Sequence, residues 1–243
     1  MVRFFVAPEE MKPDFLTLTG ENAAHAKVLR LKCGEQVLVC DGEGNESLCT
    51  VSDVSPGQIS LVVNSTGTSE TEPMVKASIY MAYAKGDKLE HVIQKATELG
   101  AHEIVAFPSA RCVSRPDEKS LSKKLERWQK IAVSASEQCG RGRIPKVIAV
   151  DSYQAALKRA MQTDMAILFY ENEHATTLHM ALEQNDFASI SLLTGPEGGL
   201  EEREVMMAKE AGFRICTLGS RILRCETAPL CALSAVMYAS GEF

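Results

Sequence analysis

The sequence predicts a protein of two parts: a small β-barrel, then a larger α/β domain with a mostly parallel sheet and helices on both faces. Residues 1–65 hold short apolar or alternating runs separated by turn signals, which are typical of short strands. From residue 75 onward, strand-like runs alternate with amphipathic segments, which indicates a parallel sheet with helical crossovers. The polar stretch TGTSETEP, residues 66–73, is interpreted as a linker. We therefore expect domains over residues 1–72 and 73–243.

In the first part, one helix is expected among several strands. Residues 21–30 have the composition of a helix. Strands are expected at residues 3–7, 36–40, 48–54 and 58–64.

In the second part, the elements alternate. Strands are expected at residues 78–83, 103–107, 146–150, 165–170, 189–194 and 214–218, and helices at 87–99, 121–138 and 228–239, with further helices between the later strands. The first of these helices has Asp87 as a possible cap, Glu90 three residues later, and Gly100 at its end. In such a sheet, ligands bind at the carboxyl ends of the strands.

The composition is that of an ordinary globular protein. Hydrophobic residues make up 45% and charged residues 24% of 243 positions. No apolar run reaches about 18 residues, so neither a transmembrane helix nor a membrane partner is expected. The apolar patch near the N-terminus is too short for a signal peptide, so we expect a cytoplasmic protein. The eight cysteines form no C-x-x-C pair, so we expect buried thiols rather than a metal site or disulfides.

The charges are unevenly distributed along the chain. The net charge is −6, which is not typical of a protein that binds nucleic acid. Residues 1–72 contain 5 Lys and Arg against 11 Asp and Glu, whereas residues 111–146 contain 10 against 4. The second segment could contact phosphates, and a solvated helix face followed by a loop is the alternative.

One loop is built to present its backbone. Residues 195–199, GPEGG, follow the strand expected at 189–194, and a helix is expected from Leu200 onward. Glycines let the backbone approach a ligand closely and adopt positive φ, and the free N–H groups of the helix start can bind a ligand. A tight strand-to-helix turn without any ligand is the alternative.

A second loop follows the last expected strand. Residues 218–228, LGSRILRCETA, include two cations, Arg221 and Arg224, and offer Thr227 as a cap for the last helix. A salt bridge at the helix start is the alternative role of either arginine.

Common motifs are missing. The sequence contains no G-x-x-x-x-G-K-[ST], G-x-G-x-x-G, G-x-S-x-G or H-E-x-x-H, and its five histidines show no metal spacing. A ligand held mainly by backbone, without a basic phosphate cradle, indicates a neutral or cationic adenosine compound.

Both loops resemble those of a known family. GPEGG and LGSRILRCETAPLCALSAV are similar to the RsmE family, the small-subunit ribosomal RNA (uracil-N3) methyltransferases of the SPOUT superfamily. Three more blocks resemble it in the same order: HAKVLRLKCGEQVLVCDGEG (25–44), KGDKLEHVIQKATELGAHEIVAFPSARCV (85–113) and RWQKIAVSASEQCGR (127–141). The resemblance therefore covers nearly the whole chain. It departs at Cys225, where threonine is expected, and at Pro229, where alanine is expected, which leaves the shape of that helix start open.

The resemblance implies a PUA-like RNA-binding barrel, a SPOUT domain with a trefoil knot, and a homodimer. It also implies binding of S-adenosyl-L-methionine and methylation of N3 of a uridine in 16S ribosomal RNA within the small subunit. The expected cofactor-binding residues lie on three loops: Glu171; Leu193, Thr194, Gly195, Glu197 and Gly199; and Leu218, Gly219, Ser220, Ile222 and Leu223.

The roles in the reaction are less closely specified. Arg224, and less directly Arg221, could stabilise charge on the uracil or hold a phosphate. Either Glu197 or Glu226 could be the base, and the sequence does not choose between them. RNA contacts are expected from His25, Arg30, Lys32, Arg111, Arg115, Arg141 and Arg143. Two alternatives stay open: a related enzyme acting on transfer RNA or ribose oxygen, and a non-catalytic RNA-binding assembly factor.

Overall fold

The computed structural model describes residues 1–183 and 187–243, which form two compact units. The first unit combines Met1–Glu72 with Val133–Ile144, and the second combines Pro73–Ala132 with Pro145–Phe243. The expected domains, 1–72 and 73–243, did not include this return of residues 133–144 to the first unit. The return occurs because one long helix begins in the second unit and its last turns belong to the first.

The first unit is a five-stranded sheet with the order β1-β3-β4-β5-β2. The strands are β1 (Val2–Phe5), β2 (Phe15–Thr19), β3 (Gln36–Cys40), β4 (Asn45–Ser55) and β5 (Gln58–Thr68), with a short 3-10 helix (Pro8–Glu10) and α1 (Gly20–Val28). Strand β1 pairs with β3 in parallel, and the other pairs are antiparallel. Alternate side chains such as Phe4, Leu18, Val37, Val39 and Leu61 fill its core.

Two expectations for this unit were wrong. Strand β2 (FLTLT) was not predicted; its burial alternates strictly, with Leu16 and Leu18 in the core and Phe15 exposed. The stretch 66–73 is not wholly a linker, because β5 continues to Thr68 and pairs there with Asn45. Polar composition concealed this strand end, since its side chains are exposed and only its backbone pairing defines it.

The second unit contains a six-stranded parallel sheet, as predicted. Its order is β11-β9-β10-β6-β7-β8, and every neighbouring pair is parallel. The strands are β6 (Lys76–Ala82), β7 (Glu103–Phe107), β8 (Lys146–Ala149), β9 (Met165–Phe169), β10 (Ser189–Thr194) and β11 (Arg214–Cys216). The strands β9 and β10 lie side by side, so the loops that follow them meet at one edge.

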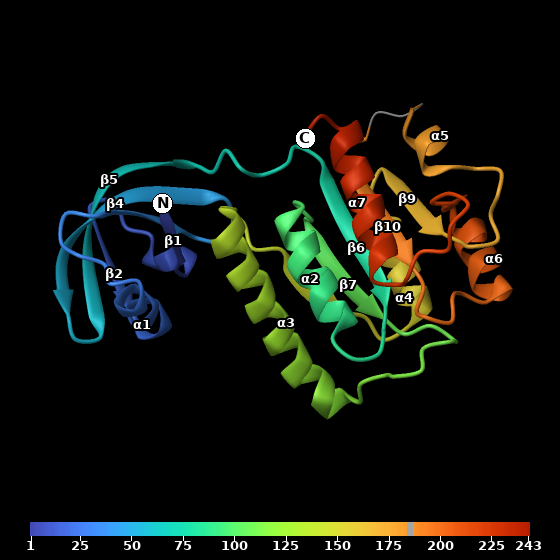
Figure 1. Ribbon diagram of the computed structural model, residues 1–243, viewed down its shortest axis with the longest axis horizontal. Helices are drawn as coiled ribbons and strands as arrows, with labels where there is room; N and C mark the ends of the chain where they lie inside the picture. Colours follow the sequence, from blue (N-terminus) through green and yellow to red (C-terminus); the bar gives the residue numbers. More distant parts are fainter. Residues whose placement is uncertain (184–186) are drawn as a thin grey trace. The chain divides into compact units, whose positions relative to one another are not determined.

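Helices cover both faces of this sheet, as Figure 1 shows. They are α2 (Lys88–Glu98), α3 (Glu118–Cys139), α4 (Tyr153–Ala160), α5 (Leu178–Glu183), α6 (Glu202–Ala211) and α7 (Thr227–Ala239). Helix α7 packs on α2, β6 and β10, whereas α4 packs on α6, β6 and β7. The strand order and the parallel pairing place the loops that follow β9, β10 and β11 at the same edge of the sheet. The trefoil knot implied by the resemblance stays a prediction, because strand order does not define how the chain threads.

The helix ends correct two expected caps. Asp87 is the N-cap of α2, but its side chain makes no cap hydrogen bond. The Glu90 side chain instead accepts a hydrogen bond from the Arg127 guanidinium at 2.6 Å. The N-cap of α7 is Glu226 rather than Thr227, which is already helical. Gly100 does follow the end of α2, with φ of 92°.

The eight cysteines are free thiols, and Cys40, Cys49, Cys216 and Cys225 are buried. Across the described ranges, no helix has the length and apolar character needed to cross a bilayer.

Candidate functional site

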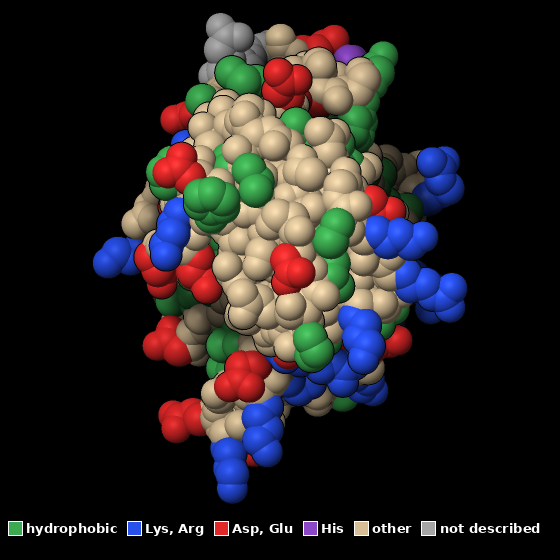
Figure 2. Space-filling view, turned by 90° about the vertical axis from the view of Figure 1, so that its left-hand side faces the viewer, with side chains coloured by type: hydrophobic (Ala, Val, Ile, Leu, Met, Phe, Trp, Pro, Cys, Tyr) green, Lys and Arg blue, Asp and Glu red, His purple; other side chains and the backbone are tan. Residues whose placement is uncertain are grey.

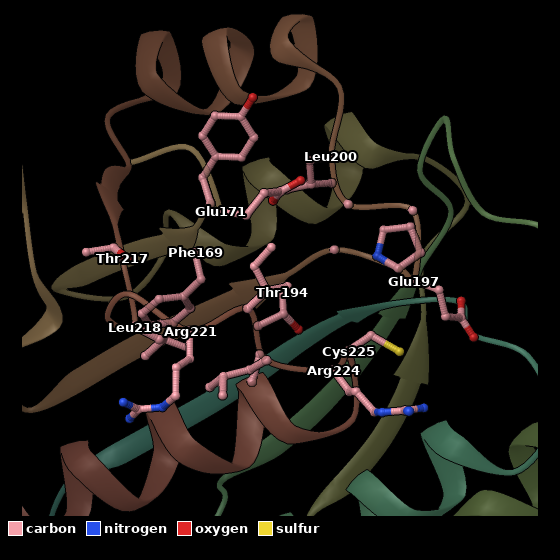
Figure 3. A pocket seen from close by; sticks show the side chains of 18 of the residues that line it. Phe169, Glu171, Thr194, Glu197, Leu200, Thr217, Leu218, Arg221, Arg224 and Cys225 are labelled. Carbon is pink, nitrogen blue, oxygen red and sulfur yellow. The ribbon is translucent and has the colours of Figure 1, made fainter. Parts of the chain in front are cut away.

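The second unit has a cavity of about 680 Å³ where β9, β10 and β11 end. Figure 3 shows side chains from all three loops directed toward it. Its lining comes from residues 169–171 and 174, residues 194–200, residues 217–225, and from Lys88 and Ala228. The volume is in the range of pockets that bind small organic ligands.

Gly199 explains why the loop after β10 is rich in glycine. Its φ is +69°, a conformation that other residues rarely adopt. A Cβ atom there would lie 2.2 Å from Oε1 of Glu171, which follows β9. The N–H of Gly199 donates to the carbonyl of Pro196 at 2.9 Å, closing a tight turn. The loop therefore lies directly against the Glu171 carboxylate and presents its backbone to the cavity.

The loop after β11 is closed by its own hydrogen bonds. The N–H of Gly219 donates to Oγ1 of Thr217 at 3.2 Å, and that hydroxyl donates to the Gly219 carbonyl at 3.1 Å. At its other end, the N–H groups of Thr227 and Ala228 donate to the Arg224 carbonyl at 2.8 and 2.9 Å. The backbone of Arg224 is thus fixed to the first turn of α7.

The cavity has an apolar side and a charged side. Phe169 and Leu218 lie together in Figure 3, away from Glu197, Cys225 and Arg224. The guanidinium groups of Arg221 and Arg224 extend in different directions, and both side chains are exposed. In the described part of the chain, neither of them forms an ion pair.

Lys88, at the start of α2, brings two acidic residues together. Its Nζ lies 3.2 Å from Oε1 of Glu197 and 3.5 Å from Oε2 of Glu226. Lys88 was not predicted as a site residue, although it lies in the block 85–113. Its position gave no local signal, because the partner carboxylates are more than a hundred residues away in the sequence.

The pKa of each of these two carboxyls is lowered. Partial burial alone would raise the pKa of Glu197, but hydrogen bonds from the Lys85 N–H and from Lys88 outweigh it. Burial likewise opposes ionisation of Glu226, and its own N–H, the Cys225 thiol and Lys88 together lower its pKa. A carboxylate with a lowered pKa is a weak base at neutral pH. Neither residue is therefore well suited to take a proton from a weakly acidic group.

Cys225 fits the place where threonine was expected. Burial and the hydrogen bond to Glu226 raise the pKa of its thiol to about 12. The thiol is therefore protonated at neutral pH and donates to Oε2 of Glu226 at 3.2 Å. A threonine hydroxyl could make the same bond, so this departure keeps the donor. Pro229 is buried in the first turn of α7, a position that tolerates proline.

The structure brings together most of the residues expected to bind the cofactor. Glu171, Thr194, Gly195, Glu197, Gly199, Leu218, Gly219, Ser220, Ile222 and Leu223 line the cavity, as do Arg221 and Arg224. Leu193 does not, because its side chain is fully buried in the core on one face of the sheet. Glu226 also lies outside the lining and reaches the site through Lys88. The lining further includes Phe169, Tyr170, His174, Leu200 and Thr217, which were not expected as cofactor-binding residues from the sequence.

The residues expected to contact RNA lie in different environments. Arg30, Lys32, Arg111 and Arg115 are exposed, and His25 is half-buried against the ring of Phe4. Arg111 donates to the Gly198 carbonyl at 3.0 Å, and Arg115 donates to the Ser109 carbonyl. Arg143 is half-buried and donates to the Glu43 carbonyl at 2.8 Å. The side chain of Arg141 is only 4% exposed and is bonded to Glu72, so its guanidinium faces the protein interior.

Comparison with known proteins decides the family. A family model described as an RNA methyltransferase domain matches residues 70–237, and one described as an RNA methyltransferase PUA domain matches residues 18–64. The ribosomal RNA small subunit methyltransferase E of Bacillus subtilis (strain 168) is 39% identical, over 98% of this chain and 96% of its own. The chain belongs to the ribosomal RNA small subunit methyltransferase E family.

Further members of this family match over nearly the full chain. The methyltransferase E of Synechocystis sp. (strain ATCC 27184 / PCC 6803 / Kazusa) is 34% identical, over 96% of this chain and 76% of its own. The crystal structure of the methyltransferase E of Neisseria gonorrhoeae, bound to S-adenosyl methionine, has a TM-score of 0.87 at 30% identity. It covers 98% of this chain and 97% of its own. The two-part α/β architecture is thus that of the methyltransferase E family.

Proposed function

We propose that this chain transfers the methyl group of S-adenosyl-L-methionine to N3 of a specific uridine in 16S ribosomal RNA. The observation that supports this most strongly is the convergence of three loops on one cavity at the carboxyl edge of the sheet. Ten of the eleven residues expected to bind the cofactor line that cavity. The membership in the methyltransferase E family agrees with this reading.

The cavity has the chemistry that S-adenosylmethionine requires. Glycine-rich backbone from the loops after β10 and β11 offers N–H and carbonyl groups for an adenine edge. Phe169 and Leu218 provide an apolar wall, and Glu171 provides a negative charge near a cationic ligand. S-adenosylmethionine, when bound, supplies a methyl group attached to a positively charged sulfur. The protein has to orient the uridine and assist the loss of its N3 proton.

Arg224 is proposed as the residue that assists the chemistry. It is exposed at the cavity, and its backbone is fixed by two hydrogen bonds from α7. When the N3 proton leaves, negative charge spreads to the uracil oxygens, and a guanidinium can stabilise that charge. Because Glu197 and Glu226 have lowered pKa values, we propose that they act as fixed negative charges rather than as the base. The bond from sulfur to methyl breaks as the bond from methyl to N3 forms, and the N3 proton is released to water.

RNA contacts are proposed for basic residues of each unit: Arg30 and Lys32, with the half-buried His25 and Arg143, in the first unit, and the exposed Arg111 and Arg115 in the second. Arg141 is omitted because its side chain is buried. Figure 2 shows Lys and Arg side chains interspersed with Asp and Glu side chains, so that basic residues do not cover the face in view. This distribution fits local contacts with RNA by each unit of a protein with net charge −6.

The homodimer and the cytoplasmic location are further parts of the proposal. Ile222 and Tyr238 are 87% and 75% exposed in the single chain, so apolar side chains near α7 are available to a second copy. A substrate in the small ribosomal subunit fits a cytoplasmic enzyme.

The test is methyl transfer from isotope-labelled S-adenosylmethionine to small ribosomal subunits that lack the modification. Nucleoside mass spectrometry should then find the label in 3-methyluridine. Label in another nucleoside would point to a related enzyme of different specificity. If the cofactor does not bind, the chain would instead be a non-catalytic RNA-binding assembly factor. Binding without transfer would direct the search to free RNA or to an assembly intermediate.

A further inference from the structure

Three separate segments of the second unit meet at one ammonium group. Lys88 begins α2, Glu197 belongs to the loop after β10, and Glu226 is the N-cap of α7. The Nζ atom of Lys88 is within 3.5 Å of a carboxylate oxygen from each of the other two segments. The side chains are 27%, 25% and 22% exposed, for Lys88, Glu197 and Glu226 respectively, so water screens them only in part.

Hydrogen bonds around Lys88 add to this connection. The N–H of Lys85, just before α2, donates to the same Glu197 oxygen at 2.9 Å, so the start of α2 and the residues before it contact that carboxylate twice. On the other side, Cys225 donates to the Glu226 oxygen that Lys88 contacts. Glu197 and Glu226 make no bond to each other, and their charges repel. In the described structure, the ammonium is the group that contacts both.

The two segments that Lys88 connects contain the residues of the proposed reaction. Glu197 lies in the loop expected to contact the cofactor, and Glu226 follows Arg224 by two residues. Because the Arg224 carbonyl accepts hydrogen bonds from Thr227 and Ala228, a movement of the α7 start would carry Arg224 with it. The loop after β10 contains three glycines in five residues, so its own backbone restrains it weakly.

We propose that Lys88 is a positioning residue of the methyl-transfer site, which fixes the Arg224 segment relative to the cofactor loop by contacting Glu197 and Glu226 at once. This role rests on the proposed function. The raised pKa of Lys88, due first to its hydrogen bond with Glu197, agrees with a permanently charged ammonium. Lys88 is also in the cavity lining, so direct contact with a substrate is the competing role.

The test compares Lys88→Met with Lys95→Met. Lys95 lies on the same helix and pairs with Glu98 at 2.8 Å, away from the cavity lining, so its loss removes a comparable surface ion pair. We expect Lys88→Met to lower kcat for methyl transfer on the order of tenfold to a hundredfold, since small misplacements of reacting groups have effects of this size. Lys95→Met should stay within about twofold of wild type. Equal activity of the two variants would overturn the proposal.

Two further variants distinguish a positioning role of Lys88 from a role in fold stability or in RNA binding. Lys88→Arg keeps a cation that can contact two carboxylates, so it should recover most of kcat. If Lys88 acts through Glu226, Lys88→Met with Glu226→Gln should be no slower than Lys88→Met alone. If Lys88 only stabilised the fold, Lys88→Met would lower the thermal midpoint without changing kcat of the folded enzyme. If Lys88 bound RNA, Lys88→Met would raise KM, and the effect of Lys88→Met would add to that of Glu226→Gln. Either result would contradict positioning.

Hydrogen exchange gives a readout that needs neither cofactor nor RNA. In Lys88→Met, the backbone amides of residues 197–200 and 225–228 should exchange faster together, whereas Lys95→Met should leave both segments unchanged. Unchanged exchange in Lys88→Met would refute the connection itself. Faster exchange in a protein whose wild type transfers no methyl group would instead leave the connection intact and refute the proposed function. If Lys88→Met is too unstable to purify, Lys88→Arg and Glu226→Gln allow the same comparison. Lys88→Arg should retain most of kcat, and Glu226→Gln should lose it.

Discussion

Two clusters of charged side chains, one in each unit, differ in what surrounds them. In the first unit, Arg141 is 4% exposed and its Nη2 lies 2.7 Å from Oε2 of Glu72, whose Oε1 also accepts the Arg143 N–H at 3.0 Å. In the second unit, Lys88 is 27% exposed and lies beside the cavity. The first pair is enclosed by the fold, whereas the second connects glycine-rich and helix-start segments that face a ligand site.

This comparison teaches that burial, rather than charge, decides the role of a basic residue. A buried arginine without its partner leaves an uncompensated charge, so the pair is needed for folding. The partly exposed Lys88 is partly screened by water, so its loss costs less stability and its effect falls on the position of the loops. From the sequence, Arg141 was expected to contact RNA, because local charge does not reveal that its side chain is buried.

The largest expected effect concerns the buried cluster. Replacing Arg141 by Met should lower the free energy of unfolding by about 3–5 kcal/mol, because Glu72 would remain largely buried without its cation. Urea unfolding followed by circular dichroism measures this change. Lys27→Met, at an exposed position of α1 in the same unit, is the control and should change stability by less than about 0.5 kcal/mol. Similar stability of the two variants would show that burial does not separate these roles.

Arg224 provides the opposite case, a cation that should affect chemistry without affecting folding. Arg224→Ala should reduce kcat about a hundredfold, as expected for loss of a group that stabilises developing charge. Affinity for S-adenosylmethionine, measured by calorimetry, should change little, since the proposed contacts with the cofactor are mainly made by backbone groups. Arg221→Ala is the matched variant from the same loop and should have the smaller effect. Unchanged transfer in Arg224→Ala would remove this residue from the reaction.

Gly199, in the loop after β10, can be compared with Gly57 in the first unit, because both have positive φ. Gly199→Ala should weaken binding of S-adenosylmethionine roughly tenfold, because positive φ costs an alanine about 1–2 kcal/mol and Glu171 must move. Gly57→Ala has the same backbone strain, with φ of +78° and open space around the new Cβ, in the turn between β4 and β5. It should therefore lower stability while leaving the affinity unchanged. Equal affinities in the two variants would argue against a ligand at the loop after β10.

The smallest expected effect is the pH dependence that comes from the buried thiols. Burial raises the pKa of Cys40, Cys49 and Cys216 to about 11, and that of Cys225 to about 12, from 9.0. Stability from these thiols is complete below pH 9 and is lost as the pH rises toward their folded pKa values, because the unfolded chain then releases protons first. Cys225→Thr keeps the donor to Glu226 but has no ionisable thiol. Its free energy of unfolding should therefore fall by about 1 kcal/mol less than that of wild type between pH 8 and 10.

Urea midpoints at the two pH values measure that difference. Cys33→Ser, at an exposed thiol, serves as the control and should follow wild type. A Cys225→Thr protein that is as sensitive to alkali as wild type would contradict a protonated, buried thiol at this position.

Local pattern was sufficient for most elements and for the two loops of the site. The parallel sheet followed from strand–helix alternation, and GPEGG and the segment 218–228 stood out by composition before any geometry was known. By contrast, Leu193 was expected in the cavity because it adjoins the loop, yet its side chain points into the core. One residue of difference along a strand reverses the direction of a side chain, and a motif match does not report it.

What the sequence by itself determined were features that depend on neighbouring residues: strand and helix periodicity, the glycine-rich turns and the absence of a phosphate cradle. Tertiary structure alone decided which charges meet. Glu72 and Arg141 are 69 residues apart, and Lys88 reaches carboxylates contributed by loops much later in the chain. The strand order brings such residues together, and the burial that results fixes whether a charge supports the fold or faces the site. Neither quantity is encoded at any single position.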